Sequence, residues 1–435
     1  ATAGILLGFG VAVFLIIWDQ FYFPFRLQSD WQVTTVALTI TGLLLLGYLI
    51  FVIREFKDYS LRSKLVIAFI LVTILSVGIV VSVTNWLVSQ ALIATATKQI
   101  NAASGQTADV VDTFLQNNIT TLRTEAQLPL FSELLEATDS GPDNYQAVNV
   151  LLRLSEKDPK NIVYYGLLDR SGRVVADTAG SLLVTDESAN DYFKIPFTTN
   201  RPYISPVFFS GTLREPVFYI STPVQNVLGE PVGVLKVIYR ADILQQVIEQ
   251  ENQLLGEGSF ALLFDEHNLR LADGEEPDAR YTLAGPLASE QIDRLRAEGR
   301  LPPGESEEFT LGLVELQAGL NNATSEPSFV AGVHREDVTE EHEDRLSVTP
   351  LQVQPNWRVA FAQPPEVVLA PVQEQTRLAI ILAVVVVVGV GAIAFGLGQY
   401  LTGPIVRLTR VAEQITAGDM QVKAPVESQD EIGTL

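Results

Sequence analysis

The sequence of 435 residues has no cysteine, one methionine and three histidines, and its 29 Lys and Arg stand against 51 Asp and Glu, a formal net charge of −22. The lack of cysteine excludes disulfides, thiolate metal sites and cysteine nucleophiles. The shortage of basic residues excludes nucleic-acid binding, because phosphate contacts need surfaces rich in Lys and Arg. The sequence also has no Gly-rich phosphate loop, catalytic triad or zinc-binding helix. We therefore predict no catalytic residue, no metal and no cofactor within these residues.

Charged residues are missing from four long apolar runs, at residues 1–18, 31–53, 65–97 and 378–406. About 20 apolar residues cross a bilayer as a helix, and a buried core helix rarely needs a run of this length. The sequence therefore predicts a multi-pass protein of the cell (inner) membrane. We place its four transmembrane helices at residues 1–18, 31–53, 65–89 and 376–401. The chain begins at Ala1 without an initiator Met, so we expect it to be a fragment of a longer protein.

The short loops predict the orientation in the membrane. Residues 54–64 carry four Lys and Arg, whereas residues 19–30 carry one. Since basic loops stay in the cytoplasm, residues 98–377 are expected outside it and residues 402–435 inside it. The outer insert has 42 acidic against 21 basic residues, a net charge of −21, and so holds nearly all of the charge of the chain.

A long helix is expected to leave the membrane and continue into the acidic insert. The pattern from about residue 64 to 128 is helical and contains no proline, and a second helix is expected at 144–157, after the turn-like DSGPDN. We assign residues 90–137 to a stalk helix.

Strand patterns follow the helices. A hairpin is expected at 161–178, and further strands at 201–209, 215–226 and 231–240, separated by Gly, Pro and Asn turns. Asp242 then begins a helix that is expected to reach residue 255. These patterns define a first α+β lobe at 138–242 and an interlobe helix at 243–255.

The hairpin is repeated 96 residues later. DRSGRVVAD at 169–177 matches DEHNLRLAD at 265–273 in its first Asp, its turn former and its final Ala-Asp. The repeat predicts a second α+β lobe at 256–363. This lobe is expected to have a helix at 289–298 and strands near 309–316, 328–334, 346–352 and 357–362. Asp169 and Asp265 are expected to stabilise the two hairpin turns.

Segment 190–244 (NDYFKIPFTTNRPYISPVFFSG…GEPVGVLKVIYRADIL) resembles the double Cache extracellular sensor domain, as does WRVAFAQPPEVVLAPV before the last apolar run. The resemblance implies an α+β membrane protein with tandem PAS-like lobes on the stalk helix. It also implies a small-ligand site in the first lobe, which such sensors place far from the membrane.

The tail TGPIVRLTRVAEQITAGDMQVKAPVESQDEIGTL, residues 402–435, is similar to the first part of a HAMP linker, and we expect the linker to be truncated here. Proline at the start of a helix is tolerated because its missing N–H would be unpaired there anyway. A spacing of three and four apolar residues is typical of a coiled-coil seam. The positions expected to relay a signal are the helix start, the seam, the helix break and the opening of the next helix: Pro404, Ile405, Leu408, Ala412, Ile415, Gly418 and Glu431.

The Cache resemblance also implies pocket positions, on the helix after the hairpin and on the facing strands. They are Tyr192, Phe193, Arg201, Tyr203, Ser205, Tyr219, Ser221, Lys236 and Ile238. Aromatic walls with a few polar groups suit a small-molecule site. Ordinary strand packing is the alternative interpretation for each of these residues.

Two departures from the amino-acid-binding Cache proteins bear on the ligand. Residues 188–191 replace the Arg and Trp that precede the aromatic pair, and Ile238 stands where an Asp would hold the ligand's ammonium group. Lys236 lies two residues away on the same face of its strand. We therefore expect a carboxylate or uncharged ligand rather than an amino acid, with Lys236 or Arg201 pairing an anion.

The acidic stretch HREDVTEEHEDRL at 334–346 offers two His and six carboxylates, which leaves Ca²⁺ or Zn²⁺ binding open. A solvated loop is the favoured interpretation, because ligands this close in sequence rarely converge on one ion.

The pattern as a whole predicts a transmembrane receptor that acts as a homodimer and passes ligand binding through HAMP to a cytoplasmic signalling partner. A histidine kinase, chemotaxis or cyclase domain after Leu435 is left open. The alternative is a non-signalling membrane protein whose acidic outer domain is an interaction or structural module.

Overall fold

The computed structural model describes residues 54, 59–137, 144–179, 186–211, 213–304, 309–334 and 343–417. The predicted helices at 1–18 and 31–53 lie outside these residues, as do Gly418 and Glu431. The chain divides into two compact units, one of Ala1–Leu92 with Leu369–Leu435 and one of Ile93–Val368.

Two helices in the described part of the chain are long and apolar enough to cross a membrane: α3 (Leu61–Ala126) and α10 (Pro365–Thr416). Their most apolar windows have mean hydropathies of 2.9 and 3.1. Large apolar side chains such as Leu75 (66% exposed) and Leu382 (65% exposed) point outward, as in helices that face lipid rather than a protein core. These helices agree with the predicted third and fourth spans.

One detail of the HAMP prediction is wrong. Pro404 does not begin a helix, because α10 runs through it without a break from Pro365 to Thr416. The missing N–H of Pro404 therefore removes a hydrogen bond inside the helix. The helix ends at Thr416, just before Gly418, as the pattern predicted.

The predicted long helix is α3, but it ends at Ala126, so the stalk assigned to 90–137 is not one helix and includes the separate α4 (Pro129–Glu136). Helix α5 (Asn144–Ser155) follows. The first lobe contains α6 (Asp191–Thr199) and an antiparallel sheet in the order β2-β1-β6-β5-β3, with β4 also paired to β5. Its strands are β1 (Ile162–Asp169), β2 (Val174–Asp177), β3 (Tyr203–Ile204), β4 (Phe208–Phe209), β5 (Pro216–Gln225) and β6 (Pro231–Arg240).

The second lobe repeats this arrangement in a sheet of order β8-β7-β11-β10-β9. Its strands are β7 (Phe260–Phe264), β8 (Arg270–Asp273), β9 (Ser328–Ala331), β10 (Asp344–Pro350) and β11 (Arg358–Gln363), and its helical segments are η2 (Pro277–Ala279), α8 (Ser289–Ala297) and α9 (Val314–Asn322). Gly166 pairs with Asp177 in the first hairpin and Leu262 with Asp273 in the second, and the register shifts at the same place after each pair. The internal repeat is therefore real at the level of strand register.

Both hairpin turns are held as predicted. Asp169 Oδ1 accepts backbone hydrogen bonds from Ser171 (2.8 Å) and Arg173 (3.0 Å), and Asp265 Oδ1 accepts them from His267 (2.8 Å) and Leu269 (2.9 Å).

Two elements differ from the prediction. The interlobe helix α7 is Asp242–Glu249 and does not reach residue 255. The chain turns after α7, because Gln253 adopts φ 62°, in the left-handed region, and its N–H donates a hydrogen bond to the carbonyl of Ser259 at 2.7 Å.

The predicted strand near 309–316 is wrong, since α9 begins at Val314. Its buried Leu316 and Leu320 are spaced by one helical turn, whereas the alternating pattern before them suggested a strand.

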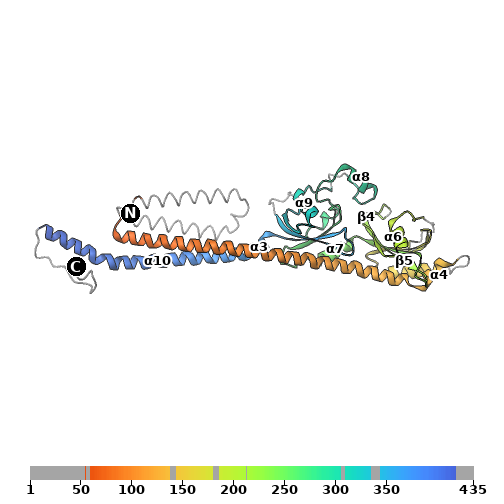
Figure 1. The fold of residues 1–435 in the computed structure, drawn as a ribbon, viewed down its shortest axis with the longest axis horizontal. Coiled ribbons are helices and arrows are strands. Elements are labelled where there is room, and N and C mark those ends of the chain that lie inside the picture. Colours follow the sequence, from red (N-terminus) through yellow and green to blue (C-terminus); the bar gives the residue numbers. More distant parts are fainter. Residues whose placement is uncertain are drawn as a thin grey trace. The chain divides into compact units, whose positions relative to one another are not determined.

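Within the unit Ile93–Val368, called the sensor unit below, the sheet of each lobe lies between α3 and a shorter helix, α6 or α9 (Figure 1). Polar groups fix α3 to both sheets. Glu125 accepts a hydrogen bond from Tyr165 (2.9 Å) in the first lobe, and Ser104 donates to the carbonyl of Val359 (3.3 Å) in the second. The stalk is thus a structural part of both lobes.

Asp112 links the stalk to the second lobe through both of its carboxylate oxygens. Its two carboxylate oxygens accept the backbone N–H groups of Gln352 and Val353, each at 2.8 Å. We expect Asp112→Ala to lower the free energy of unfolding by about 2 kcal/mol, because two partly buried donors lose their acceptor. Chemical denaturation of the full chain measures this loss. The exposed Asp109→Ala on the same helix is the control, and an equal effect of the two substitutions would contradict the assignment.

Candidate ligand-binding site

A row of residues crosses the first sheet on the face that looks away from α3. Strand pairing places Gly166 opposite both Asp177 and Lys236, Lys236 opposite Ser221, and Ser221 opposite Tyr203. Neighbours along each strand point to opposite faces. Tyr165 faces the stalk and donates to Glu125, so Tyr164 and Gly166 face the other way, toward α6.

Lys236 is the centre of this row and is 2% exposed. Its ammonium forms an ion pair with Glu187, which precedes α6. The rings of Tyr192, Tyr219 and Tyr164 surround the same nitrogen, with centroids 4.8, 5.5 and 5.2 Å from Nζ. Burial lowers the pKa of Lys236, and the negative charge of Glu187 opposes that change. The arrangement is a buried cation held by one carboxylate and three aromatic faces.

The three tyrosines pack tightly and stay neutral. The rings of Tyr192 and Tyr219 are tilted by 34° with centroids 4.3 Å apart, and the Tyr164 hydroxyl donates to Asp177 at 3.4 Å. Burial, and then the nearby Glu187, raise the pKa of Tyr219 to about 12. Burial also raises the pKa values of Tyr164 and Tyr192. Near neutral pH these side chains therefore offer hydroxyl groups and ring faces, not charge.

The absence of a side chain at Gly166 leaves space for the side chain of Lys236. A Cβ at this position would lie 2.8 Å from Cε of Lys236 and 2.9 Å from Cε1 of Tyr164. We expect Gly166→Ala to destabilise the protein by about 1–3 kcal/mol, because both neighbours are packed. The same change should displace Lys236 and weaken ligand binding.

Thermal unfolding and ligand titration measure the two effects of Gly166→Ala. Gly105→Ala is the control, since a Cβ there would meet nothing within 4 Å. Ala is favoured over Gly inside a helix by up to about 1 kcal/mol, so the control should stabilise. Unchanged stability and ligand binding in Gly166→Ala would contradict the close packing of Lys236 and Tyr164 against Gly166.

The structure brings five of the predicted site residues together: Tyr192, Tyr219, Ser221, Lys236 and Ile238. Ser221 is fully buried, and its hydroxyl has no hydrogen-bond partner among the described residues. This hydroxyl is an unused polar group beside the lysine.

Of the other four predicted residues, Tyr203 lies at the edge of the row, opposite Ser221, and the remaining three have other surroundings. Phe193 belongs to a small apolar core with Leu168, Val174 and Val234. Ser205 is occupied locally, since its hydroxyl accepts from the N–H of Tyr219 and donates to the carbonyl of Pro206, both at 2.8 Å. Arg201 is exposed and makes no ion pair with any described residue, and Tyr203 is half-buried on the edge strand β3.

The sequence reasoning missed Tyr164, Gly166, Asp177 and Glu187. The predicted exclusion of amino-acid ligands is not supported. It rested on the absence of an acid at Ile238, but Glu187 and Asp177 bring carboxylates to Lys236 from other elements. An ammonium group of a ligand would therefore find acidic partners here.

The same row in the second lobe is apolar except for Asp273, which is paired with Arg270. Asp273, Leu262, Ala360 and Val348 take the places of Asp177, Gly166, Lys236 and Ser221. Leu316 and Leu320 of α9 pack against this row in one core cluster. The comparison of the two lobes singles out the first as the one with a polar, aromatic-lined site.

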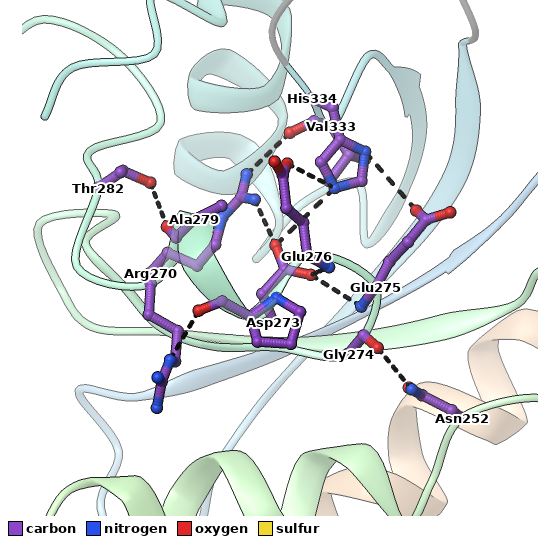
Figure 2. Close-up of polar contacts among 12 residues, drawn as sticks. Asn252, Arg270, Asp273, Gly274, Glu275, Glu276, Ala279, Thr282, Val333 and His334 are labelled. Carbon is purple, nitrogen blue, oxygen red and sulfur yellow. Dashed lines mark hydrogen bonds and ion pairs between the residues drawn. The ribbon is translucent and has the colours of Figure 1, made fainter.

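The second lobe has a polar cluster of its own at the end of β8, and Figure 2 shows Asp273 between Arg270 and His334. Arg270 and Asp273 are fully buried and form an ion pair, and Arg270 also donates to the carbonyl of Val333 at 2.8 Å. The imidazole of His334 is 3.6–3.9 Å from carboxylate oxygens of Asp273, Glu275 and Glu276.

No group of three or more His, Asp or Glu side chains suited to a metal ion occurs in the part of the chain that the structure describes. Most of the predicted acidic loop, residues 335–342, lies outside that part. The contacts of Arg270 are those of a structural ion pair, because both partners are closed off from solvent.

Comparison with known proteins agrees with this architecture. The Cache domain family (dCache_1) matches residues 88–372, and the HAMP domain matches residues 396–435. No match was found among the curated proteins.

Solved structures with a similar fold include the sensor domain of the Vibrio cholerae histidine kinase DctB, at 16% identity and a TM-score of 0.48, covering 63% of this chain and 98% of that one. Another is the ligand-binding domain of the Campylobacter jejuni chemoreceptor Tlp3 in complex with 4-methylisoleucine, at 15% identity and a TM-score of 0.42, covering 64% and 94%. A third is the ligand-binding domain of the Pseudomonas fluorescens chemoreceptor CtaA in complex with L-serine, at 12% identity and a TM-score of 0.42, covering 63% and 99%.

A Cache sensor followed by HAMP, with two apolar helices, is the arrangement of a transmembrane signal receptor that has its sensor outside the cell and its HAMP domain in the cytoplasm. The chain belongs to the Cache domain family.

Proposed function

We propose that the first lobe of this receptor binds a small organic carboxylate at Lys236. The observation that carries the proposal is the buried ammonium within three tyrosine rings, where the second lobe has Ala360 in an apolar cluster. A charge-assisted hydrogen bond to a carboxylate is among the strong polar contacts in proteins. The ring faces suit the apolar part of such a molecule, and the free hydroxyl of Ser221 supplies a second polar contact.

The ligands that test this proposal are carboxylates and uncharged amides of similar shape, so that the effect of ligand charge is measured separately. The full chain in lipid nanodiscs is titrated with acetate, malonate and L-alanine, and with the neutral counterparts acetamide and malonamide, at constant ionic strength. We expect at least one carboxylate to bind and its amide to bind at least about 10-fold more weakly, since a hydrogen bond between charged groups contributes about 1.5–3 kcal/mol. L-alanine tests whether Asp177 or Glu187 accepts an ammonium. Equal binding of acids and amides would rule out a carboxylate site.

Signal transfer is proposed to run through α10 into HAMP in a parallel homodimer. The seam positions of the HAMP helix support a partner helix, because Ile405 and Ile415 are 37% and 43% exposed in the single chain. Ligand binding would favour one of two packings of the paired HAMP helices. The helices would pass this change in packing to a cytoplasmic histidine kinase or chemotaxis partner. The apolar runs at 1–18 and 31–53 are proposed as two further spans.

Disulfide trapping tests the dimer. Cysteine introduced at Ile405 should form a symmetric cross-link in membranes, whereas cysteine at the exposed Glu413 outside the seam should cross-link less. Equal cross-linking at both positions would contradict a defined seam.

A further inference from the structure

Lys236 already has a carboxylate partner, and the two members of the pair differ in their freedom to move. Lys236 lies on β6, which is paired on both sides by β1 and β5, and it is 2% exposed. Glu187 belongs to the connection between β2 and α6, and 17% of its side chain is exposed. Its backbone is fixed by the hydrogen bond from its N–H to the carbonyl of Gly172 (2.8 Å), so only the side chain is free to turn toward water.

We propose that Glu187 is an internal competitor, whose carboxylate occupies the position on Lys236 that the carboxylate of the ligand takes. The ligand then binds by exchange, and Glu187 turns outward. This inference rests on the proposed carboxylate site and adds the residue that sets its threshold and its selectivity for charge.

Charge balance explains why only an anion makes the exchange. When one carboxylate replaces another, the ammonium of Lys236 stays paired and Glu187 regains water. A neutral ligand that displaced Glu187 would leave a buried, unpaired ammonium, which is strongly unfavourable. The pair therefore rejects amides and other uncharged molecules of similar shape.

The buried pair in the second lobe gives the contrast. Arg270 and Asp273 are both 0% exposed and lie three residues apart, at the two ends of β8. Neither side chain reaches water by rotation, so this pair is not exchangeable. The exposure of Glu187 is what distinguishes a replaceable partner from a structural one.

The expected size of the effect follows from a two-state competition. If Lys236 is free of Glu187 for about 1–10% of the time, the apparent affinity is reduced about 10- to 100-fold. Glu187→Gln removes the competing charge and should therefore raise the affinity for carboxylates by that factor. The amides should gain less than the carboxylates, because a neutral group gives the ammonium no charged partner.

The experiment titrates the full chain in lipid nanodiscs with acetate, malonate and L-alanine, and with acetamide, in the wild type, Glu187→Gln and Glu187→Asp. The Asp side chain keeps the charge but is one methylene shorter, so its affinity for carboxylates should lie between those of the other two. Glu215→Gln is the matched control, since Glu215 pairs with Arg240 (3.1 Å) in the same lobe and lies outside the row. It should bind like the wild type.

The outcomes separate the two proposals. Tighter carboxylate binding by Glu187→Gln, with Glu187→Asp in between, supports the exchange, even if the wild type binds too weakly to measure. Unchanged or weaker binding by both variants, with normal binding by the wild type, overturns the exchange and leaves the carboxylate site standing. If no carboxylate of the panel binds to any form, the site and the exchange both fail.

Discussion

Replacing Lys236 with Met is expected to lower the affinity of the receptor for its carboxylate ligand about 10- to 100-fold. A hydrogen bond between charged groups contributes about 1.5–3 kcal/mol, and each 1.4 kcal/mol is a factor of ten in affinity. Met is unbranched and flexible, so it fills the space among the tyrosine rings without the charge. Glu187, which is partly exposed, is then free to turn into water.

Calorimetric titration of the full chain with the tightest-binding carboxylate of the panel measures the loss. The control is Lys194→Met, because Lys194 is an exposed lysine on α6 in the same lobe. It changes the net charge equally but should leave affinity unchanged. Amide binding should not fall in either variant. An unchanged carboxylate affinity in Lys236→Met would remove the lysine from the site.

Trp357→Ala is expected to cause the largest loss of stability, about 3–5 kcal/mol, which is typical of a large buried aromatic side chain. Trp357 is fully buried just before β11 and packs edge-on against Phe218 of the first lobe, with centroids 6.1 Å apart. Phe218 in turn stacks on Tyr239, whose hydroxyl donates to Asn118 of the stalk at 2.8 Å. The substitution therefore opens a cavity where both lobes meet the stalk.

Thermal and chemical unfolding of the sensor unit measure this loss. Tyr145→Ala is the control, because that ring is 68% exposed on α5 and surface substitutions usually stay within about 0.5 kcal/mol. A loss below about 1 kcal/mol for Trp357→Ala would mean that the two lobes do not share a core.

The sequence predicted the elements with strong periodicity. The helix α3, the two hairpins and the second apolar helix α10 follow from runs and spacings that one local pattern explains. The strand predicted near 309–316 was wrong because alternation over a few residues is ambiguous, and the helical spacing of Leu316 and Leu320 decides the outcome through packing on the sheet.

The site was predictable in part, for a physical reason. Lys236, Tyr219 and Ser221 lie on paired strands, where the two-residue period and the family resemblance place them on one face. Glu187 reaches the lysine from a connection without any period, so only the three-dimensional fold reveals it. Tyr164 was within reach of sequence reasoning, since it lies on the predicted hairpin strand β1 and pairs with the predicted site residue Ile238.

The internal repeat shows how one fold yields two different lobes. The hairpin registers correspond, yet Lys236 in the first lobe has Ala360 as its counterpart in the second. An apolar row covered by α9 stabilises the second lobe, whereas the first lobe holds a buried charge whose partner we propose to be replaceable.

Hydrogen exchange of the full chain, with and without malonate at equal ionic strength, tests the central claim most directly. Carboxylate binding at Lys236 should protect the amides of β1, β5 and β6 in the first lobe, and residues 186–190 should exchange faster as Glu187 is displaced. The second-lobe strands β7, β8 and β11 should stay unchanged. Protection confined to the second lobe, or none in the first at malonate concentrations that saturate binding, would contradict the account.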